Sequence, residues 1–599
     1  MGRRASRAGS AEKETSLLKG GDMLVVIDTE ASGLYPWRGA RICGWAAMVD
    51  GREPYYVAFR HRLPDRPTPF YTGAEQHQRS EQEAKFRLEL LLSQADVLIG
   101  HNLKFDLHML AAEGIRPKRE ARIWDTMIGA FLLNPDEPSF ALKALAKSVD
   151  PHASQLQDEL KRYLAENRLK DEEGNWRFDW VPPDILGAYA CKDVELTWRL
   201  AQAQWARLSD LAQIDHRILE VAEWDMRLLR TLQQVEEYGV CVDLSRCIEL
   251  EQECSRRITE LEEAARRMIG REIRLSSTRQ VADQLRRLGI EGALSTATGE
   301  VSTSELSLAS VDHPFVRLLL ECRSWVKARA TYRSLQELTV DGRLHPQLNQ
   351  VGYVTGRIAC SNPNLQGLPH PDEIHREREV IVASPGCRLW FFDYSQMELR
   401  TLANYAEEPA MVQAFREGQD IHQATAELLG VSRRDAKRVN FGLVYGTGPH
   451  ALARLWGLTP ERAQELIRRH REVYPRVRAL TQEVERVART RGYIYYWTGR
   501  RRDTSSLPGH KVLQTLISGG CADVMRRAMV RVQEIARRAG GSIVAQIHDE
   551  LIVELPEGAD WAVPEIVEAM EDFEFFELVP LKVDISCGTS WAKKREVVV

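Results

Sequence analysis

The chain lacks the features expected of a membrane-bound or disulfide-stabilised protein. Its 599 residues contain no run of about 18 apolar residues and no apolar segment near the N-terminus, so we expect neither a membrane span nor a secretory signal. Ten cysteines occur without a C-x-x-C pair, which argues against a zinc site and a disulfide framework. These absences favour a reducing, cytoplasmic compartment.

The chain also has no excess of basic charge. It carries 81 Lys and Arg residues against 86 Asp and Glu residues, a net charge of −5. Taken alone, this balance mildly disfavours a nucleic-acid partner, but a sum hides basic clefts and acidic metal sites that occur together. Local basic runs occur at residues 467–478 and 498–503. Each run is equally compatible with a solvated helix face or turn.

The length predicts three or more domains, since one domain usually holds about 100–200 residues. Residues 1–21 are polar, basic and end in glycine, so we expect a flexible tail. Over residues 22–205, strand-like and helix-like stretches alternate, which predicts an α/β domain. Residues 206–340 show helical periodicity. Strand-like stretches return near 386–393, 493–498 and 541–555, so the whole chain is expected to be a multidomain α/β protein.

The first 205 residues contain four acids in strand and helix contexts that suggest a metal site. Asp28 and Glu30 end a β-branched run and point to the same face of the expected strand. Asp106 follows the next strand, in the first turns of a helix, while Tyr189 and Asp193 lie one helical turn apart. Carboxylate oxygens suit Mg²⁺ or Mn²⁺, and four of them can hold two ions about 4 Å apart. A nearby tyrosine hydroxyl can orient the attacking water.

A second acidic group lies in the C-terminal half. The apolar run WFF leads directly into Asp393, and two strand-like stretches meet at His548-Asp549-Glu550. The simpler interpretation of the first segment is a strand followed by a helix with Ser395 as N-cap. Glu398 would then complete a capping box, and the hairpin acids would be a solvated turn. If the strand ends share one sheet, these acids could instead hold two Mg²⁺ ions.

Between these segments, four side chains recur every four residues along one expected helix. Arg433 and Lys437 begin the series, and Phe441 and Tyr445 end it. Polyphosphate is bound by Arg and Lys, whereas a base or sugar packs against an aromatic ring. An amphipathic helix with two core aromatics and two exposed cations would explain the spacing equally well.

Two sets of motifs resemble known families. The order D-x-E, N-x-x-x-D (Asn102, Asp106) and Y-x-x-x-D resembles 3′→5′ exonucleases that use four acids and a tyrosine, which implies a ribonuclease H-like domain. The segments DYSQMELR, RRDAKRVNFGLVYG and QIHDE resemble the bacterial DNA polymerase I family, the family A polymerases. YVTGRIACSNPNLQGLP, DIHQATAELLG and VDISCGTSW also match that family. The likeness runs from about residue 22 to the end.

The resemblance implies an exonuclease domain followed by a hand-shaped polymerase over 206–599. Residues 206–345 would be mostly thumb, 346–410 and 500–599 mostly palm, and 411–499 mostly fingers. It implies a DNA-directed DNA polymerase with 3′–5′ proofreading that acts on primer–template DNA and dNTPs. The cofactor would be Mg²⁺, two ions per active site, with Mn²⁺ as a substitute. The chain would act as a monomer in a bacterial or phage-infected cell, with accessory factors left open.

The resemblance assigns roles residue by residue. The metal ligands would be Asp393 and Asp549 in the palm, and Asp28, Glu30, Asp106 and Asp193 in the exonuclease domain. Glu550, Lys437 and Tyr189 would complete the catalytic groups. Nucleotide contacts would come from Gln396, Glu398, His422, Arg433, Lys437, Phe441 and Tyr445. DNA contacts would come from Arg357, Asn364, Gln366, Arg400, Gln546 and His548.

The sequence departs from the family pattern in one segment, and other functions are also compatible with it. Gln514 and Ser518 stand where the family carries Asn and Gln, so the DNA contacts of that helix are open. No 5′-nuclease domain is expected before residue 22. One alternative is a stand-alone exonuclease whose C-terminal part only binds DNA. Another is a relative of single-subunit RNA polymerases or a reverse transcriptase. Glu398 argues against an RNA product, because in the family it fills the space of a ribose 2′-hydroxyl.

Overall fold

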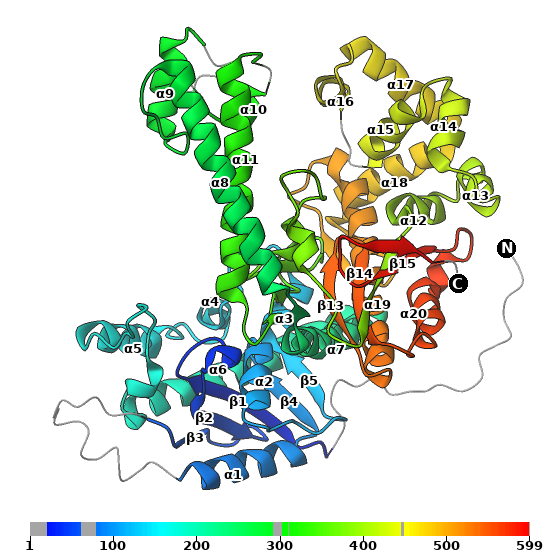
Figure 1. The fold of residues 1–599 in the computed structure, drawn as a ribbon. Helices are drawn as coiled ribbons and strands as arrows, with labels where there is room; N and C mark the ends of the chain where they lie inside the picture. The colour runs from blue at the N-terminus through cyan, green and yellow to red at the C-terminus, as the bar shows by residue number, and fades with distance from the viewer. Residues whose placement is uncertain (1–20, 62–79, 291–301, 310, 445–447, 598–599) are drawn as a thin grey trace, which may run out of the picture.

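The computed structural model describes residues 21–61, 80–290, 302–309, 311–444 and 448–597. The expected tail, 1–21, lies almost wholly outside this part of the chain. Two large hydrophobic cores organise the described residues, one around an N-terminal sheet and one around a C-terminal sheet with its helices (Figure 1). The predicted multidomain α/β architecture is confirmed. Within the described ranges, no helix is long and apolar enough to cross a membrane.

The N-terminal sheet has five strands in the order β3-β2-β1-β4-β5. Strand β1 is antiparallel to β2 and parallel to β4. It is buried at every position except Leu24 and Asp28, which explains its continuous run of apolar and β-branched residues. The strands are β1 (Leu24–Ala31), β2 (Ile42–Val49), β3 (Tyr55–Ala58), β4 (Val97–Gly100) and β5 (Arg122–Asp125).

Helices cover both faces of this sheet (Figure 1). Helix α6 packs across strands β1 to β4 on one face. Helix α1 covers the other face, where the Trp45 indole donates to the Ala84 carbonyl at 3.3 Å. The helices of this part are α1 (Glu81–Gln94), α2 (Leu103–Ala112), α3 (Thr126–Leu133), α4 (Leu142–Leu145), α5 (Gln155–Glu166) and α6 (Pro183–Ala212). The charged segment 150–183 forms α5 and its flanking turns, as predicted.

Helix α7 (Arg217–Tyr238) connects the two cores. Val221 and Met226 pack in the N-terminal core, whereas Leu228 and Leu232 pack in the C-terminal core. Beyond α7, a column of helices rises from the C-terminal sheet (Figure 1). It consists of α8 (Leu244–Ile269), α9 (Thr278–Arg287), α10 (Glu305–Leu308) and α11 (Pro314–Leu338).

Helix α8 confirms the predicted apolar stripe. Cys247, Leu250, Cys254 and Ile258 are buried, and α8 packs along α11. Met268, predicted on the same stripe, is 47 % exposed. The helix ends one residue later, at Ile269, and is followed by Gly270, which has the left-handed backbone that terminates helices.

The C-terminal sheet is antiparallel and has the order β13-β14-β10-β15-β16. Strand β10 lies in its middle, between β14 and β15, and residues 389–392 are buried. Helices α19 and α20 pack against the sheet (Figure 1). The elements are β10 (Cys387–Tyr394), β13 (Ser542–Ile547), β14 (Glu550–Pro556), β15 (Val583–Gly588), β16 (Lys594–Glu596), α19 (Gly509–Arg538) and α20 (Ala562–Glu571).

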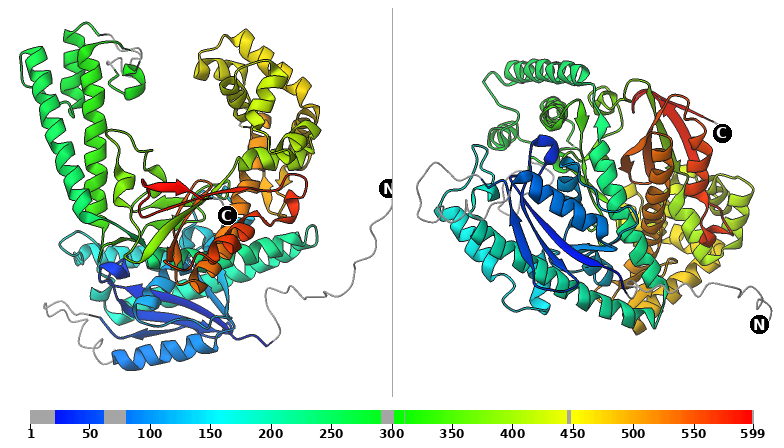
Figure 2. Two further views of the ribbon diagram at one scale, coloured as in Figure 1. Left: turned by 45° about the vertical axis from the view of Figure 1, so that its right-hand side comes forward. Right: turned by 90° about the horizontal axis from the view of Figure 1, so that it is seen from below.

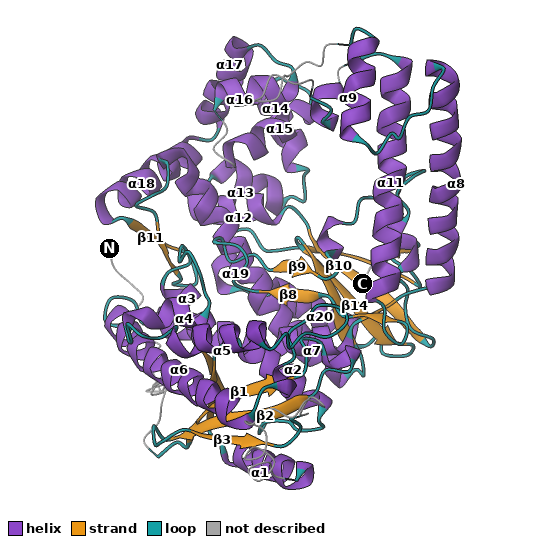
Figure 3. Ribbon diagram, turned by 90° about the vertical axis from the view of Figure 1, so that its left-hand side faces the viewer, coloured by secondary structure: helices purple, strands orange, loops and turns teal. Residues whose placement is uncertain are grey.

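A lobe of helices stands opposite the column, on the other side of the C-terminal sheet (Figures 2 and 3). It contains α12 (Met397–Ala406), α13 (Pro409–Arg416), α14 (Ile421–Leu429), α15 (Arg433–Val444), α16 (Pro449–Trp456), α17 (Pro460–Val473) and α18 (Pro475–Arg491). The described residues also form three two-stranded sheets: β6 (Val240–Cys241) with β7 (Arg343–Leu344), β8 (Gln347–Asn349) with β9 (Ala359–Ser361), and β11 (Tyr493–Tyr495) with β12 (Arg501–Asp503).

Candidate active sites

The first candidate site lies toward the C-terminal end of β1, the middle strand of the N-terminal sheet. Asp28 and Glu30 leave the same face of the strand. Burial, partly offset by Lys143, raises the pKa of Asp28 to about 6. Burial and the charges of Asp28 and Asp106 raise the pKa of Glu30 well above its usual range. Two buried acids of like charge are unfavourable unless a cation lies nearby.

Helices α2 and α6 add the other predicted side chains to this cluster. Asp106, on α2, is 2 % exposed, and its Oδ1 accepts hydrogen bonds from the Thr29 amide at 2.8 Å and hydroxyl at 2.7 Å. Burial and the charge of Asp28 raise the pKa of Asp106. Asp193 and Tyr189 come from α6, and burial, Glu30 and Asp28 raise the pKa of Tyr189. The charges of Asp28, Glu30 and Asp106 therefore act on one another, and those of Asp28 and Glu30 act on Tyr189.

A lysine that the sequence did not single out lies within this cluster. Lys143, on the short helix α4, is 6 % exposed and forms an ion pair with Asp193 Oδ1. Apart from this pair, neither atom has a hydrogen-bond partner in the described part of the chain. The Lys143 Nζ also lies 4.8 Å from the centre of the Tyr189 ring. Burial, opposed by Asp28 and Glu30, lowers the pKa of Lys143 to about 8.

The chemistry of this cluster fits divalent metal ions. Its four carboxylates are hard oxygen donors. Burial raises the pKa values of three of them, Asp28, Glu30 and Asp106, and a bound cation would offset the cost of burying their charge. Among the described residues, however, no three His, Cys, Asp or Glu side chains are arranged closely enough to hold an ion. Thr29 holds one oxygen of Asp106, and Lys143 holds one of Asp193. Metal binding therefore requires these side chains to turn toward a common point.

The second candidate site lies at the end of β10. In the strand register, Asp393 stands opposite Glu550 of β14 on one side and Asp584 of β15 on the other. The Tyr394 amide donates to the Asp549 carbonyl at 3.2 Å, which fixes the hairpin tip beside the strand end. The predicted meeting of the two strand ends on one sheet is confirmed.

The electrostatics of this sheet edge resemble those of the first site. Partial burial and the charges of Asp549 and Glu550 raise the pKa of Asp393 to about 7. Burial also raises the pKa of Asp549. Glu550 is neutralised by Lys594 of β16, whose Nζ lies 2.9 Å from its Oε1. Asp393 and Asp549 form no ion pair within the described part of the chain, and an added cation would suit them.

The alternative capping-box interpretation of Ser395 and Glu398 is wrong. Helix α12 begins at Met397, and its N-cap is Gln396, which makes no side-chain capping bond. Glu398 Oε1 instead accepts a hydrogen bond from Arg357 Nη2 at 2.9 Å and a longer one from Ser518 Oγ at 3.4 Å. The structure therefore directs this carboxylate toward α19 and the loop that carries Arg357.

The predicted DNA contacts fall into two groups. Gln366 Nε2 donates to Gln546 Oε1 at 2.8 Å, so these two amides lie together beside the hairpin. His548, at the hairpin tip, is exposed and has a left-handed backbone with φ of 57°. Asn364 is exposed. In contrast, the Arg400 guanidinium is engaged internally, since it donates to the carbonyls of Ser395 and Pro580 at 2.9 and 2.7 Å.

The predicted nucleotide contacts lie on the lobe of helices. Lys437 is exposed on α15, and Arg433 pairs with Asp420 at 2.9 Å through Nε. His422 is buried, and its Nδ1 lies 3.1 Å from the Asn440 amide; burial lowers its pKa. The side chain of Phe441 and the whole of Tyr445 lie outside the described residues.

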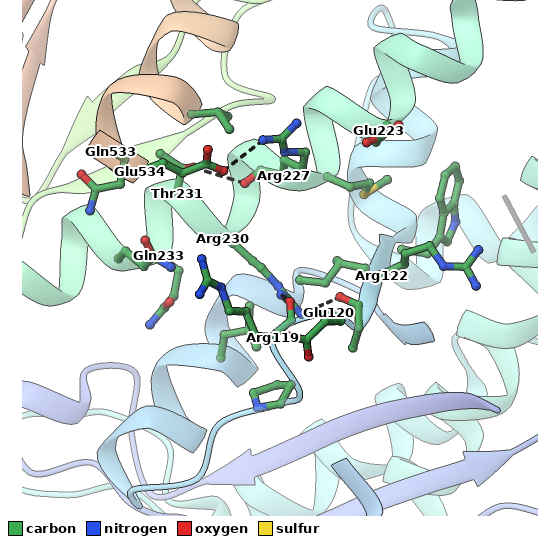
Figure 4. A pocket seen from close by; sticks show the side chains of 18 of the residues that line it. Arg119, Glu120, Arg122, Glu223, Arg227, Arg230, Thr231, Gln233, Gln533 and Glu534 are labelled. Atoms are coloured by element: carbon green, nitrogen blue, oxygen red, sulfur yellow. Dashed lines mark hydrogen bonds and ion pairs between the residues drawn. The ribbon is translucent and has the colours of Figure 1, made fainter. Parts of the chain in front are cut away.

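A cavity of about 1900 Å³ lies away from both acidic sites, between the loop before β5, helix α7 and the end of α19 (Figure 4). Its lining is rich in arginine, and several of these side chains have protein partners. Arg227 pairs with Glu534 at 3.0 Å, and Arg230 donates to the Arg119 and Ala121 carbonyls at 2.7 and 2.8 Å. None of the predicted site residues lines this cavity.

Two family models match the chain. Residues 244–593 match the model of DNA polymerase family A, and residues 10–209 match that of the 3′-5′ exonuclease. A solved structure with a TM-score of 0.76 and 26% identity covers 96% of this chain and is itself 96% covered. It is the POL domain of Pol1 from M. smegmatis in complex with DNA primer-template and dNTP.

Curated bacterial proteins are similar along most of the chain. DNA polymerase I of Pseudomonas aeruginosa is 28% identical over 95% of this chain and 63% of its own length. The thermostable DNA polymerase I of Thermus thermophilus is 31% identical over 81% of this chain and 65% of its own length. The chain spans 63%, 60%, 53% and 54% of the lengths of the proteins from P. aeruginosa, Treponema pallidum, Rhizobium leguminosarum and Chloroflexus aurantiacus.

Proposed function

Because the chain belongs to DNA polymerase family A and carries a 3′-5′ exonuclease domain, we propose that it extends DNA primers and removes mispaired 3′ nucleotides at a separate site. The predicted family resemblance is thereby confirmed. The observation that carries the proposal is the pair of acidic clusters on two different sheets. One contains Asp393 and Asp549, and the other contains Asp28, Glu30 and Asp106. A chain that only degraded DNA would have no use for the first.

In the palm, Asp393 and Asp549 would hold two Mg²⁺ ions, with Mn²⁺ as a substitute. When bound, two such ions lower the pKa of the primer 3′-hydroxyl and neutralise charge on the α-phosphate and leaving pyrophosphate. Lys594 neutralises Glu550, which leaves the other two carboxylates for the cations. The end of β10, fixed on both sides by β14 and β15, holds Asp393 rigidly in place.

The lobe would bind the incoming dNTP. Arg433 and Lys437 lie on the same helix and would contact the triphosphate, with His422 behind them on α14. Phe441 and Tyr445 would pack against the sugar and base. Helix α15 contacts α12 and α19, the helices that follow Asp393 and precede Asp549. Lobe and palm are therefore connected directly.

Glu398 would exclude ribonucleotides. Its carboxylate is held by Arg357 at 2.9 Å, so it cannot turn away freely from a ribose 2′-hydroxyl. The same reasoning favours DNA as the product over RNA. Gln396 precedes α12 and would contact the nucleotide from the strand end.

Primer–template DNA would lie across the palm. Arg357, Asn364, Gln366, Gln546 and His548 would contact it, and the engaged Arg400 would act mainly by holding the palm together. The complex of the similar M. smegmatis domain with primer-template DNA and dNTP supports these partners. In this assignment residues 206–345 are mostly thumb, 411–499 mostly fingers, and 346–410 with 500–599 mostly palm. The chain would act as a monomer. Its ten free cysteines support a reducing, cytoplasmic compartment.

In the exonuclease domain, over 22–205, Asp28, Glu30, Asp106 and Asp193 would hold two divalent ions. Tyr189 keeps its proton because burial and the neighbouring acids raise its pKa. Its hydroxyl would therefore orient the attacking water as a hydrogen-bond donor or acceptor, without becoming a base.

Primer extension tests the polymerase part directly. A 5′-labelled primer on a defined template is incubated with Mg²⁺ and one dNTP at a time. We expect only the complementary nucleotide to be added, and Asp549→Ala to abolish addition. Without dNTPs, the wild type should shorten the primer and Asp28→Ala should not. If the wild type only shortens the primer under every dNTP condition, the chain is an exonuclease with a DNA-binding C-terminal part.

A further inference from the structure

We propose that Lys143 is the resident counter-cation of the exonuclease cluster, and that its ammonium competes with a divalent metal ion for Asp193. The inference rests on the proposed exonuclease function of this cluster. In this proposal Lys143 lowers the affinity of the cluster for a divalent metal ion. Lys143 would be a positioning residue, since it acts through Asp193 and not on the DNA.

The burial of Lys143 points to a specific electrostatic role. Its side chain is 7 % exposed and that of Asp193 is 9 % exposed. A buried ammonium is unfavourable unless it is paired, and Asp193 provides that pair. The Tyr189 ring, 4.8 Å away, gives the ammonium a second favourable neighbour.

The two nearby lysines, Lys192 and Lys147, do not take the place of Lys143. Lys192 is adjacent to Asp193 in the sequence but pairs with Asp150 at 2.9 Å and Glu195 at 3.1 Å. Lys147 lies one turn beyond Lys143 and is exposed. Among the described residues, Lys143 is the basic side chain whose charge acts on both Asp28 and Glu30.

The position of the ammonium conflicts with metal binding at the same carboxylate. A metal ion on Asp193 Oδ1 would lie next to the ammonium, and two cations on one oxygen repel each other. The described acids are not arranged around a common point, as expected when one of them is already paired. The lysine stem is long and flexible, so the ammonium can leave while α4 stays in place. Metal entry would then displace it.

The first test measures Mn²⁺ binding to the full chain by electron paramagnetic resonance. The background variant Asp549→Ala removes a ligand of the palm site, so binding reports mainly on the exonuclease cluster. Lys143→Met keeps the length of the side chain and removes its charge. We expect it to bind Mn²⁺ about tenfold more tightly, because no ammonium competes. The matched control, Lys147→Met, should leave the affinity unchanged.

The second test uses the wild-type chain and does not depend on a variant that folds. Lysines are acetylated with acetic anhydride, with and without Mn²⁺, and the peptides are mapped by mass spectrometry. Lys143 should be protected without metal and become at least about threefold more reactive with Mn²⁺, because displacement exposes it. Lys147 should react equally in both conditions.

Two results separate failure of this inference from failure of the proposed function. If Mn²⁺ binds and Asp28→Ala weakens it, but Lys143→Met binds equally or more weakly and metal does not change Lys143 reactivity, the counter-cation role is wrong. If Asp28→Ala leaves Mn²⁺ binding unchanged in the Asp549→Ala chain, the cluster is not a metal site. Its proposed exonuclease function then fails together with the role of Lys143.

Discussion

The ion-pair network around Asp225 should connect the stability of the polymerase core to pH. Asp225, in the middle of α7, is 1 % exposed and accepts hydrogen bonds from Arg500 at 2.8 Å and Arg526 at 2.7 Å. Arg526 also donates to the Gly356 carbonyl at 2.7 Å. The next residue is Arg357, the partner of Glu398. Asp225→Asn would therefore loosen both α7 and the loop that bears a proposed DNA contact.

The magnitude follows from the charges involved. Removing one partner of a buried ion pair typically costs about 3–5 kcal/mol, here because two buried guanidinium groups lose their counter-charge. Burial alone would raise the pKa of Asp225, but Arg500 and Arg526 outweigh it and lower the pKa from 3.8 to about 2. This depression contributes about 2 kcal/mol to the free energy of unfolding. The contribution is complete above about pH 4 and is lost as the pH falls toward 2.

Urea unfolding followed by circular dichroism at pH 7, 5, 4 and 3 measures both the loss of stability in the variant and its dependence on pH. We expect Asp225→Asn to lower the free energy of unfolding at pH 7 by several kcal/mol. The difference in the free energy of unfolding between the wild type and the variant should decrease by about 1 kcal/mol by pH 3. Asp210→Asn, an exposed aspartate on α6, is the matched control and should follow the wild type. A difference below 1 kcal/mol at pH 7, or a difference that stays constant down to pH 3, would show that the Asp225 ion pairs do not stabilise the fold in this way.

Three further predictions concern the two sites and their support. Glu398→Ala should raise ribonucleotide incorporation relative to dNTPs by roughly 10- to 200-fold in single-nucleotide insertion kinetics; an unchanged ratio would contradict its role. The Mg²⁺ concentration for half-maximal extension should rise as the pH is lowered from 8 to 6, because only the ionised form of Asp393, whose pKa is about 7, binds metal. The Mg²⁺ requirement of the exonuclease should rise in the same direction, because burial raises the pKa values of Asp28, Glu30 and Asp106; a requirement that does not change with pH would oppose the assignment. Gly519→Ala should lower thermal stability by about 1–3 kcal/mol, since its Cβ would lie 2.0 Å from Tyr496 Cζ, and unchanged unfolding would show that the ring moves aside.

The acids at the ends of strands were predictable because their local pattern is unusual. Asp and Glu are unfavourable in strands. They nevertheless end two apolar strand-like runs, at Asp393 and at the D-x-E pair that begins with Asp28. The helix periodicity of α8 and the His548-Asp549 hairpin were also readable from spacing alone. The capping box at Ser395 failed although its spacing is correct, because Arg357, distant in sequence, holds the Glu398 carboxylate.

The missed residues depend on contacts between distant segments. Lys143 stands in an ordinary amphipathic stretch, and nothing in that stretch shows that α6 will place Asp193 against it. Asp584 and Lys594 join the acidic cluster at the end of β10 through strand pairing. The VDISCGTSW segment offered a signal for Asp584, since it matched the family, but no signal marked Lys594.

The separation of two active sites in one chain is tested most directly with a 5′-labelled primer whose 3′-terminal nucleotide is mismatched with the template. In the presence of Mg²⁺ and dNTPs, the wild type should first shorten this primer and then extend it to full length. Asp28→Ala should extend a matched primer but leave the mismatch uncorrected, and Asp549→Ala should shorten both primers and extend neither. If either substitution abolishes both shortening and extension in a folded protein, the two clusters do not act as separate sites, and the account is contradicted.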